Sequence, residues 1–271
     1  MERRATFDVY GDIELQKRIL GNVKGQIIEE KIMGERLEIT VFSESPAYQY
    51  LQSVIEDKKL RGSCGEVWKF MKKEIEAAQF YRMGIADPWE LDGKSEENFN
   101  TDYDMSNACS RCGAGRELAS DLKVPLTKIK KKDIAMLPPS IIINERLYDL
   151  IHGLNLTGCS FKPVRDYRTN NSSSYRQLII NNILPPLQSP TQIIKEEGYW
   201  YCHECGKRGN LLRSGLAYRE SDLSNAKDFN VTQEWFGLAV LEHEIIVSKR
   251  VREVFKQEKI KSVVFQPVYI V

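Results

Sequence analysis

Two pairs of cysteines are the residues whose type and spacing most clearly indicate chemistry. Cys109 and Cys112 stand in the sequence CSRCG, and Cys202 and Cys205 stand in CHECG. Two intervening residues let both sulfurs of a pair reach one tetrahedral ion, and the following glycine permits the tight turn beneath them. Four thiolates fill the coordination sphere of Zn²⁺ at about 2.3 Å per bond and leave no position for water or substrate. The sequence therefore predicts one structural zinc ion per chain, held by all four cysteines.

Two other arrangements of these cysteines stay open at this point. The 89 residues between Cys112 and Cys202 exceed the usual spacing within one zinc ribbon. The two pairs could instead form separate partial sites, or lie at the surface without a metal. A shared site requires that other elements of the chain bring the pairs together.

An internal repeat supplies such elements. Residues 141–164 align without gaps to residues 245–268, an offset of 104 from 141 to 245, and six positions are identical. Each copy has an apolar triplet, then apolar residues at i, i+3 and i+4, then an alternating run, which predicts strand, helix and strand. Two halves related by a pseudo-twofold axis would bring equivalent cysteine pairs to one place. The identical pairs are Ile141/Ile245, Ile142/Ile246, Arg146/Arg250, Phe161/Phe265, Pro163/Pro267 and Val164/Val268.

The fold class expected from these patterns is α+β. Duplicated strand-helix-strand units, each preceded by a CXXCG zinc knuckle, follow an additional N-terminal α+β layer. The expected domains are an N-terminal region and a double-CXXCG domain of two repeats joined by a polar linker at 165–174. Their bounds are 1–80 for the region, 81–271 for the domain, and about 105–167 and 198–271 for the repeats.

Local patterns indicate the elements of the N-terminal region. Leu37, Ile39 and Val41 alternate with polar residues, which predicts a strand. Ser45, followed by proline, predicts the start of a helix. Apolar residues at helical spacing predict an amphipathic helix over 66–79.

The overall composition is that of an ordinary globular protein and limits the classes of partner. The chain has 39 Lys and Arg against 38 Asp and Glu, a formal net charge of +1, whereas a general nucleic-acid binder would present a strongly basic face. The N-terminus has no signal-peptide pattern, and no segment reaches the ~18 apolar residues of a membrane helix. We therefore expect a cytoplasmic protein without a membrane partner. In that reducing compartment, close cysteine pairs indicate metal binding.

The remaining chemical residues do not form a catalytic set. The sequence has no glycine-rich phosphate loop, no serine nucleophile elbow and no zinc-deaminase motif, so we expect no enzyme activity and no small-molecule substrate. His203, inside the second knuckle, is expected to be exposed, and His152 and His243 stand alone. Cys159 is expected to be a small core residue and Cys64 a loop thiol.

The two knuckles, followed at 244–268 by EIIVSKRVREVFKQEKIKSVVFQPV, resemble the bacterial double-CXXCG motif family. The resemblance covers about 80–271 and implies that Cys109, Cys112, Cys202 and Cys205 are the metal ligands. That family includes immunity proteins that protect cells against toxins delivered by kin. The chain departs from the family pattern in its first 80 residues and in having a first unit that is a complete copy of the second.

The resemblance implies a non-catalytic, zinc-stabilised binding protein, acting as a cytosolic immunity protein that binds and neutralises a bacterial toxin. The acidic stretch 87–104 could meet a basic toxin, because charge complementarity steers association; it is also an ordinary solvated loop. Its candidate contact residues are Glu90, Asp92, Glu96 and Glu97. The alternative function is a zinc-ribbon nucleic-acid-binding or regulatory protein. The cations that favour it are Arg111, Lys128, Lys130, Lys131, Lys132, Lys207 and Arg208.

Overall fold

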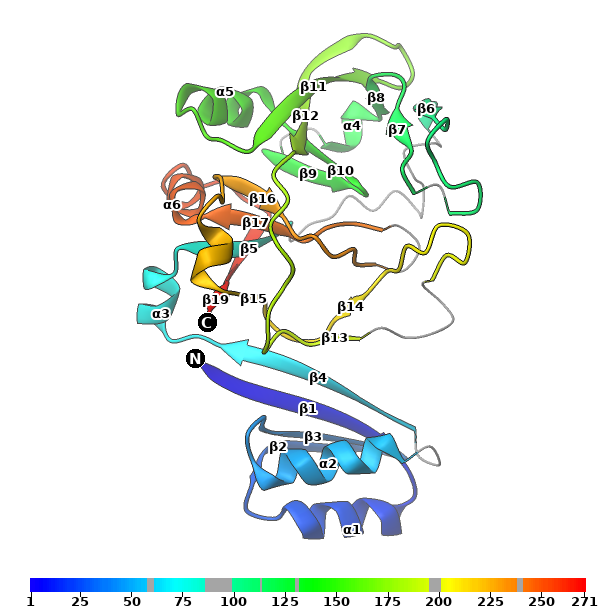
Figure 1. The fold of residues 1–271 in the computed structure, drawn as a ribbon, viewed down its shortest axis with the longest axis vertical. Coiled ribbons are helices and arrows are strands. Elements are labelled where there is room, and N and C mark those ends of the chain that lie inside the picture. The colour runs from blue at the N-terminus through cyan, green and yellow to red at the C-terminus, as the bar shows by residue number, and fades with distance from the viewer. Residues whose placement is uncertain (58–60, 86–98, 113, 130–131, 195–200, 238–240) are drawn as a thin grey trace. The chain divides into compact units, whose positions relative to one another are not determined.

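The computed structural model describes the 271-residue chain except residues 58–60, 86–98, 113, 130–131, 195–200 and 238–240. The chain divides into two compact units (Figure 1). Unit 1 contains Met1–Ala77, Pro190–Ile193 and Leu212–Gly215, and unit 2 contains the remaining described residues. The main division, after Ala77, falls close to the division expected at residue 80. The two short returns of the chain into unit 1 have no counterpart in the sequence patterns.

Unit 1 is a four-stranded antiparallel sheet with two main helices. The strand order β2-β3-β1-β4 and the chain order β-α-β-β-α-β are those of the split βαβ arrangement. Its apolar core lies on one side of the sheet, where alternate residues such as Phe7 and Ile39 are fully buried. The elements are β1 (Glu2–Tyr10), α1 (Ile13–Val23), β2 (Ile27–Met33), β3 (Arg36–Phe42), α2 (Pro46–Glu56), β4 (Arg61–Lys69) and α3 (Lys72–Ala77).

Two of the local predictions in unit 1 are confirmed and one is wrong. The alternating segment is strand β3, and Ser45 caps helix α2 by accepting a hydrogen bond from the backbone N–H of Tyr48. The helix predicted over 66–79 is wrong, because most of its first half lies in β4, paired antiparallel with β1. Only Lys72–Ala77 is helical. Trp68 is buried while its neighbour Val67 is exposed, so strand pairing determined the structure over the helical spacing.

Unit 2 contains two sheets that we call lobe A and lobe B. Lobe A has the order β8-β11-β12-β10-β9 with helix α5, and lobe B has the order β16-β17-β5-β18 with helix α6. The elements of lobe A are β8 (Leu122–Val124), α4 (Leu126–Ile129), β9 (Ile134–Leu137), β10 (Ser140–Ile143), α5 (Glu145–Gly153), β11 (Cys159–Asp166) and β12 (Ser172–Ile180). Those of lobe B are β5 (Phe80–Ile85), β15 (Ala217–Tyr218), β16 (Phe229–Val231), β17 (Ile245–Ser248), α6 (Lys249–Gln257), β18 (Val263–Pro267) and β19 (Tyr269–Ile270).

Short elements complete the chain. They are β6 (Tyr103–Asp104), β7 (Glu117–Leu118), β13 (Ile193–Ile194), β14 (Leu211–Leu212) and a 3₁₀ helix at Glu220–Leu223. Strands β6 and β7 pair with each other just outside the first cysteine pair. The described helices include none that is both long and apolar enough to cross a membrane.

The two lobes have the same pattern of strand pairing. In lobe A, Leu178 of β12 lies opposite both Ile141 and Phe161. In lobe B, Met83 of β5 lies opposite both Ile245 and Phe265, the residues 104 positions later. Each lobe also has a parallel pair: β8 pairs with β11 within the sheet of lobe A, and β15 pairs with β19 in a separate two-stranded sheet. The strand-helix-strand segments at 141–164 and 245–268 thus have the same elements in the same register.

The helices of the two lobes also begin and end alike. Asn144 caps α5 and Ser248 caps α6, each accepting from the backbone N–H three residues on. Residues 155 and 259 both have left-handed backbone, as do Gly158 and Ser262. Gly158 is required where it stands, because a Cβ there would lie 2.1 Å from the carbonyl oxygen of Phe229.

The two lobes differ in where their central strand stands in the sequence. β12 directly follows β11, and the polar stretch 165–174 forms the end of β11, the turn at 167–171 and the start of β12 rather than a flexible linker. β5 stands before the whole of lobe A in the sequence but pairs with β17 and β18 of lobe B. The expected repeats, 105–167 and 198–271, therefore omit the central strand of each sheet.

Candidate metal centre

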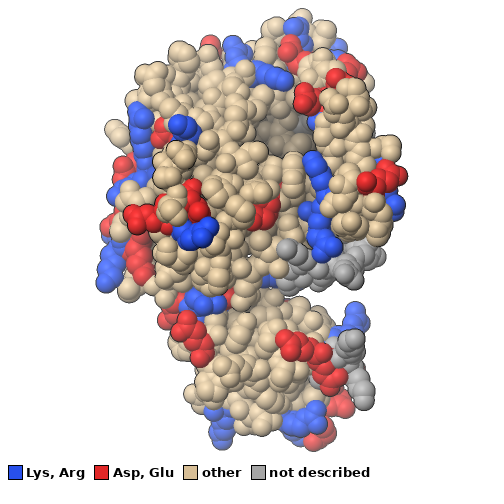
Figure 2. Space-filling model, in the orientation of Figure 1, with Lys and Arg blue, Asp and Glu red and all other residues tan. Residues whose placement is uncertain are grey.

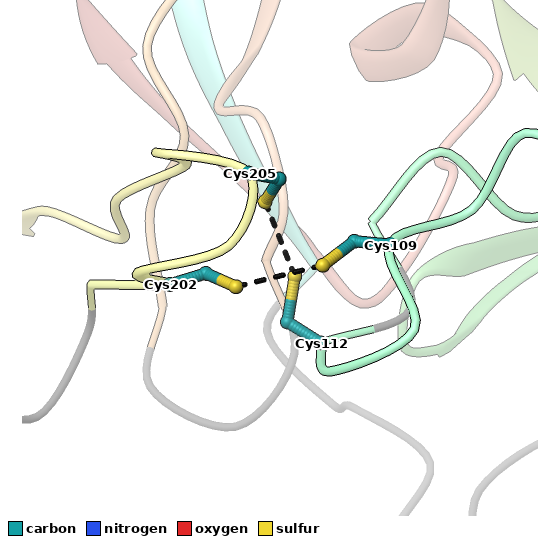
Figure 3. A group of neighbouring side chains, drawn as sticks. All are labelled: Cys109, Cys112, Cys202 and Cys205. Atoms are coloured by element: carbon teal, nitrogen blue, oxygen red, sulfur yellow. Dashed lines mark hydrogen bonds between the residues drawn. The ribbon is translucent and has the colours of Figure 1, made fainter.

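The four predicted cysteines converge on one point of unit 2. The Sγ atoms of Cys109, Cys112, Cys202 and Cys205 all lie within 4.8 Å of one another. They come from two loops, and all four sulfurs point inward (Figure 3). The Cys109–Cys202 and Cys112–Cys205 sulfur pairs are each 3.5 Å apart. Equivalent cysteines of the two knuckles thus contact each other, so the 89 residues between the pairs do not prevent a shared site.

The size of the cluster fits a tetrahedral metal ion. Four sulfurs at about 2.3 Å from a central Zn²⁺ would lie about 3.8 Å from one another. The observed spacing, from 3.5 Å for the two close pairs to at most 4.8 Å, brackets that value. Among the described residues, these cysteines are the only group of three or more metal-binding side chains so placed. The group could hold a metal ion, and its all-sulfur donor set is the one zinc accepts in structural sites.

Both knuckles have the same backbone turn. The N–H of Cys109 donates to the carbonyl of Ala114, and the N–H of Cys202 donates to the carbonyl of Lys207, at 2.8 and 2.9 Å. In the second knuckle, Gly206 has a φ of +69°, a conformation that residues with a Cβ seldom adopt, and its N–H donates to the carbonyl of Cys202. The glycine in the motif therefore serves the turn that aims both sulfurs inward.

Backbone amides in each knuckle point at the first cysteine sulfur. The N–H groups of Cys205 and Glu204 donate to Cys202 and lower the pKa of its thiol to about 6. The N–H groups of Cys112 and Arg111, at the equivalent positions, donate to Cys109. Loss of hydration raises the pKa of Cys112 to about 12. The cluster thus favours a thiolate at one of its sulfurs, and a cation would replace the protons on the others.

Polar contacts tie the two knuckles to each other. The hydroxyl of Ser110 in the first knuckle donates to the carboxylate of Glu204 in the second, at 2.7 Å. This hydrogen bond, then one from the Cys109 thiol, and then the charge of Arg111 lower the pKa of Glu204. Sequence patterns did not indicate the Ser110–Glu204 contact, because the middle residues of a CXXC motif vary freely.

Cations and aromatic rings surround the centre. Arg116 lies over Tyr103 at 4.5 Å, Lys207 over Trp235 at 4.7 Å, and Arg208 over Tyr201 at 5.1 Å from the ring centroids. Four thiolates around a divalent ion carry a net charge of about −2. Nearby cations stabilise such a centre, which gives Lys207 and Arg208 a structural role beside the predicted nucleic-acid one. Arg116 was not among the cations predicted for nucleic acid.

Two arginines that are identical in the repeat join the lobes reciprocally. Arg146 of α5 donates to the carbonyl of Glu258 at the end of α6, and Arg250 of α6 donates to the carbonyl of Leu154 at the end of α5. Each bond satisfies a carbonyl that the helix end leaves open. The sequence signal for this contact is that both copies of the repeat have an arginine at the same polar position, but no role was predicted from it.

The other predicted residues include some that the structure describes and some that it does not. Glu90, Asp92, Glu96 and Glu97 fall outside the described residues, as do Lys130 and Lys131. His203 is exposed beside Tyr201, His152 stacks on Tyr148, and His243 packs against Trp235. Cys159, expected to be a small core residue, is only half-buried on strand β11. Cys64 is not a loop thiol: it lies in β4, packed on the core of unit 1, and burial raises its pKa to about 12.

Comparisons with known proteins add no relative. No protein-family model matches the sequence, and no curated protein matches it.

Proposed function

We propose that the chain is a non-catalytic, zinc-stabilised binding protein of the double-CXXCG type, and that it acts as a cytosolic immunity protein that binds a bacterial toxin. The four-cysteine centre carries this proposal. Its four sulfurs, within 4.8 Å of one another, would use every position of a tetrahedral ion. An ion held in this way shapes the surrounding loops and does not activate water. The resemblance of the knuckles and of the segment 244–268 to that family supports the immunity role.

The same proposal treats unit 2 as a duplicated unit with its metal on a pseudo-twofold axis. The equal pairing registers of the lobes support this, as do the reciprocal bonds of Arg146 and Arg250. Contact between equivalent cysteines, 109 with 202 and 112 with 205, is what such an axis requires. A duplicated unit whose halves share one metal ion provides the rigid surface that a non-catalytic binding protein needs.

The partner in this proposal is a basic toxin. An immunity protein acts by covering its toxin, so it needs shape and charge complementarity but no catalytic group. The stretch 87–104, with Glu90, Asp92, Glu96 and Glu97, is the proposed contact, since it gathers acidic side chains against a single lysine. It follows directly on β5 and leads to the first knuckle, so its two ends are anchored in unit 2.

Protection of a cell is the direct test. The chain is expressed at graded levels in a susceptible strain that is challenged by toxin-delivering kin, and survival is measured against the number of copies. Binding predicts a threshold that rises in proportion to the toxin delivered. Catalytic removal of the toxin would instead allow a few copies to protect, and no protection at any level would contradict the immunity role.

A charge variant tests the proposed contact. Changing Glu90, Asp92, Glu96 and Glu97 to their amides should slow association with the toxin and flatten its salt dependence. The matched control changes four exposed glutamates of unit 1 to glutamine and should leave both unchanged; they are Glu14, Glu29, Glu30 and Glu35. If the two variants behave alike, the acidic stretch is not the contact surface.

Nucleic-acid binding is the second candidate, favoured by the cations beside the knuckles. Lys207 and Arg208 lie over aromatic rings, an arrangement that also occurs where single strands stack. Against it, positive and negative side chains are interspersed on the face of unit 2 shown in Figure 2. Fluorescence anisotropy with a single-stranded oligonucleotide at several salt concentrations distinguishes the two functions, because phosphate contacts give a steep negative salt dependence.

A further inference from the structure

The central strand of each lobe comes from the part of the chain that leads, through a knuckle, to the other lobe. β5 leads along the chain to the first knuckle and lobe A, but it lies in lobe B. β12 leads to the second knuckle and lobe B, but it lies in lobe A. Met83 and Leu178, which have equivalent positions in the two sheets, are 95 residues apart in sequence, and the first cysteines of the knuckles are 93 apart. Each copy therefore consists of a central strand, a knuckle and the outer elements, with the central strands exchanged between copies.

We propose that this exchange of β5 and β12 holds the two copies together, and that the metal is a removable clamp on the knuckles that connect each central strand to the rest of its copy. The proposal rests on the metal-binding part of the proposed function, but not on immunity. A central strand pairs on both sides, so withdrawing it breaks two ladders of hydrogen bonds. β5 pairs antiparallel with β17 and β18, and β12 with β10 and β11. Because lobe A, from β8 to β12, is one continuous segment of the chain, the exchange joins the two copies rather than the two lobes. Once the turn between β11 and β12 is cut, the copies cannot separate unless both sheets open.

Polar partners specify which central strand belongs in which lobe. In lobe B, the guanidinium of Arg82 on β5 donates twice to the carboxylate of Glu244, at 2.6 and 2.7 Å. At the equivalent place in lobe A, the amide of Gln177 on β12 donates to the hydroxyl of Ser140, at 2.8 Å. Returning each strand to the other lobe would set Arg82 beside Ser140 and leave the Glu244 carboxylate without its counter-ion. Such a mismatch disfavours the unexchanged arrangement.

The metal ligands lie on the two crossing connections. Cys109 and Cys112 stand between β5 and lobe A, and Cys202 and Cys205 stand between β12 and lobe B. Cys112 and Cys205 are exposed, so a chelator can reach the ion. Removing it frees the knuckles, while the exchanged strands and the reciprocal bonds of Arg146 and Arg250 are unaffected. This differs from zinc fingers, which unfold without their ion.

Cutting the turn between β11 and β12 tests the proposal on the full chain. A protease site is inserted between Thr169 and Asn170, both exposed, and the protein is cleaved into 1–169 and 170–271 with their appended site residues. Size-exclusion chromatography with light scattering is run with zinc, and with EDTA under reducing conditions. We expect a single complex of the intact mass in both buffers, an unchanged far-ultraviolet circular dichroism spectrum, and four additional reactive thiols in EDTA. Separation in EDTA alone would show that the metal is the joint, and separation in both buffers would show that the strands do not interlock the fragments.

Two variants of the cleavable chain identify the strand contact. Residues 190–193 and 212–215 also join the two fragments through unit 1, so a variant is needed to identify the strand contact. Arg82 and Glu244 fall on different fragments, so Arg82→Ala should weaken association in EDTA about tenfold or more. Arg36→Ala is the matched control, since its ion-pair partners, Asp8 at 2.7 Å and Glu38 at 3.1 Å, lie on the same fragment. Equal affinities for the two variants would overturn the role of β5 as the joint. Zinc content is measured on each sample, so a protein without zinc would contradict the metal proposal while the chromatography still tests the interlock.

Discussion

Replacing one cysteine of either knuckle should remove most of the metal, and by the same amount whichever knuckle is changed. Cys109 and Cys202 contact each other at 3.5 Å and have equivalent places in their turns. Structural zinc in small domains is held by about 10–16 kcal/mol at pH 7. If four equivalent sulfurs share that energy, losing one weakens zinc binding by about 10²–10³-fold. Cys109→Ser and Cys202→Ser should therefore have matching zinc dissociation constants, both far above that of the parent.

Competition with a chromogenic chelator, followed by metal analysis of the dialysed protein, measures this effect. Cys64→Ser and Cys159→Ser are the controls, because both thiols are half-buried outside the cluster and should leave zinc content at one per chain. Full occupancy in Cys109→Ser or in Cys202→Ser would refute the shared site. So would loss of zinc in only one of the two variants, since that result requires a site built on a single knuckle.

Three further outcomes follow from the contacts of single residues. Gly158→Ala should destabilise the chain by about 2–4 kcal/mol, because its φ is +87° and the new Cβ would meet a carbonyl oxygen at 2.1 Å. The control is Gly153→Ala, where a Cβ would have no atom within 4 Å. This variant should leave the unfolding midpoint in urea almost unchanged or raise it. Arg146→Ala and Arg250→Ala should each cost about 1 kcal/mol, equal within error, in thermal denaturation, and a large inequality would argue against reciprocal roles. The free energy of unfolding should fall as pH rises from about 9 towards 12, because the Cys64 thiol stays protonated in the fold above the pKa it has when unfolded, and Cys64→Ala should remove that part of the slope.

Short-range patterns predicted the knuckles and the repeated elements, because their determinants are local. The spacing of Cys109 and Cys112 is a property of one turn, and the apolar triplets at 141 and 245 are buried strands in both lobes. The predicted helix at 66–79 failed because helical spacing and strand alternation coincide over a few residues, and pairing with β1 decided between them.

The exchange of central strands had no local signal. The sequence patterns predicted neither β5 nor β12, and nothing in either segment indicates the lobe that it joins. That choice depends on Arg82 and Glu244, which are 162 residues apart. A single ion pair at such a separation is visible only after the chain is folded. The position of the four sulfurs was therefore predictable from the repeat, but the connections that carry them were not.

The position of β5 also determines when lobe B can form during synthesis of the chain on the ribosome. Tyr81 and Met83 are buried between β17 and β18, but β17 begins at Ile245, 160 residues after the end of β5. At roughly 5–20 residues per second, synthesis of that interval takes roughly 8–30 s. During this time the growing chain contains β10 and β11, which present β5 with the place that β12 later fills. β5 is therefore synthesised long before its partners, and the sheet of lobe B can be completed only after β17 and β18 have emerged.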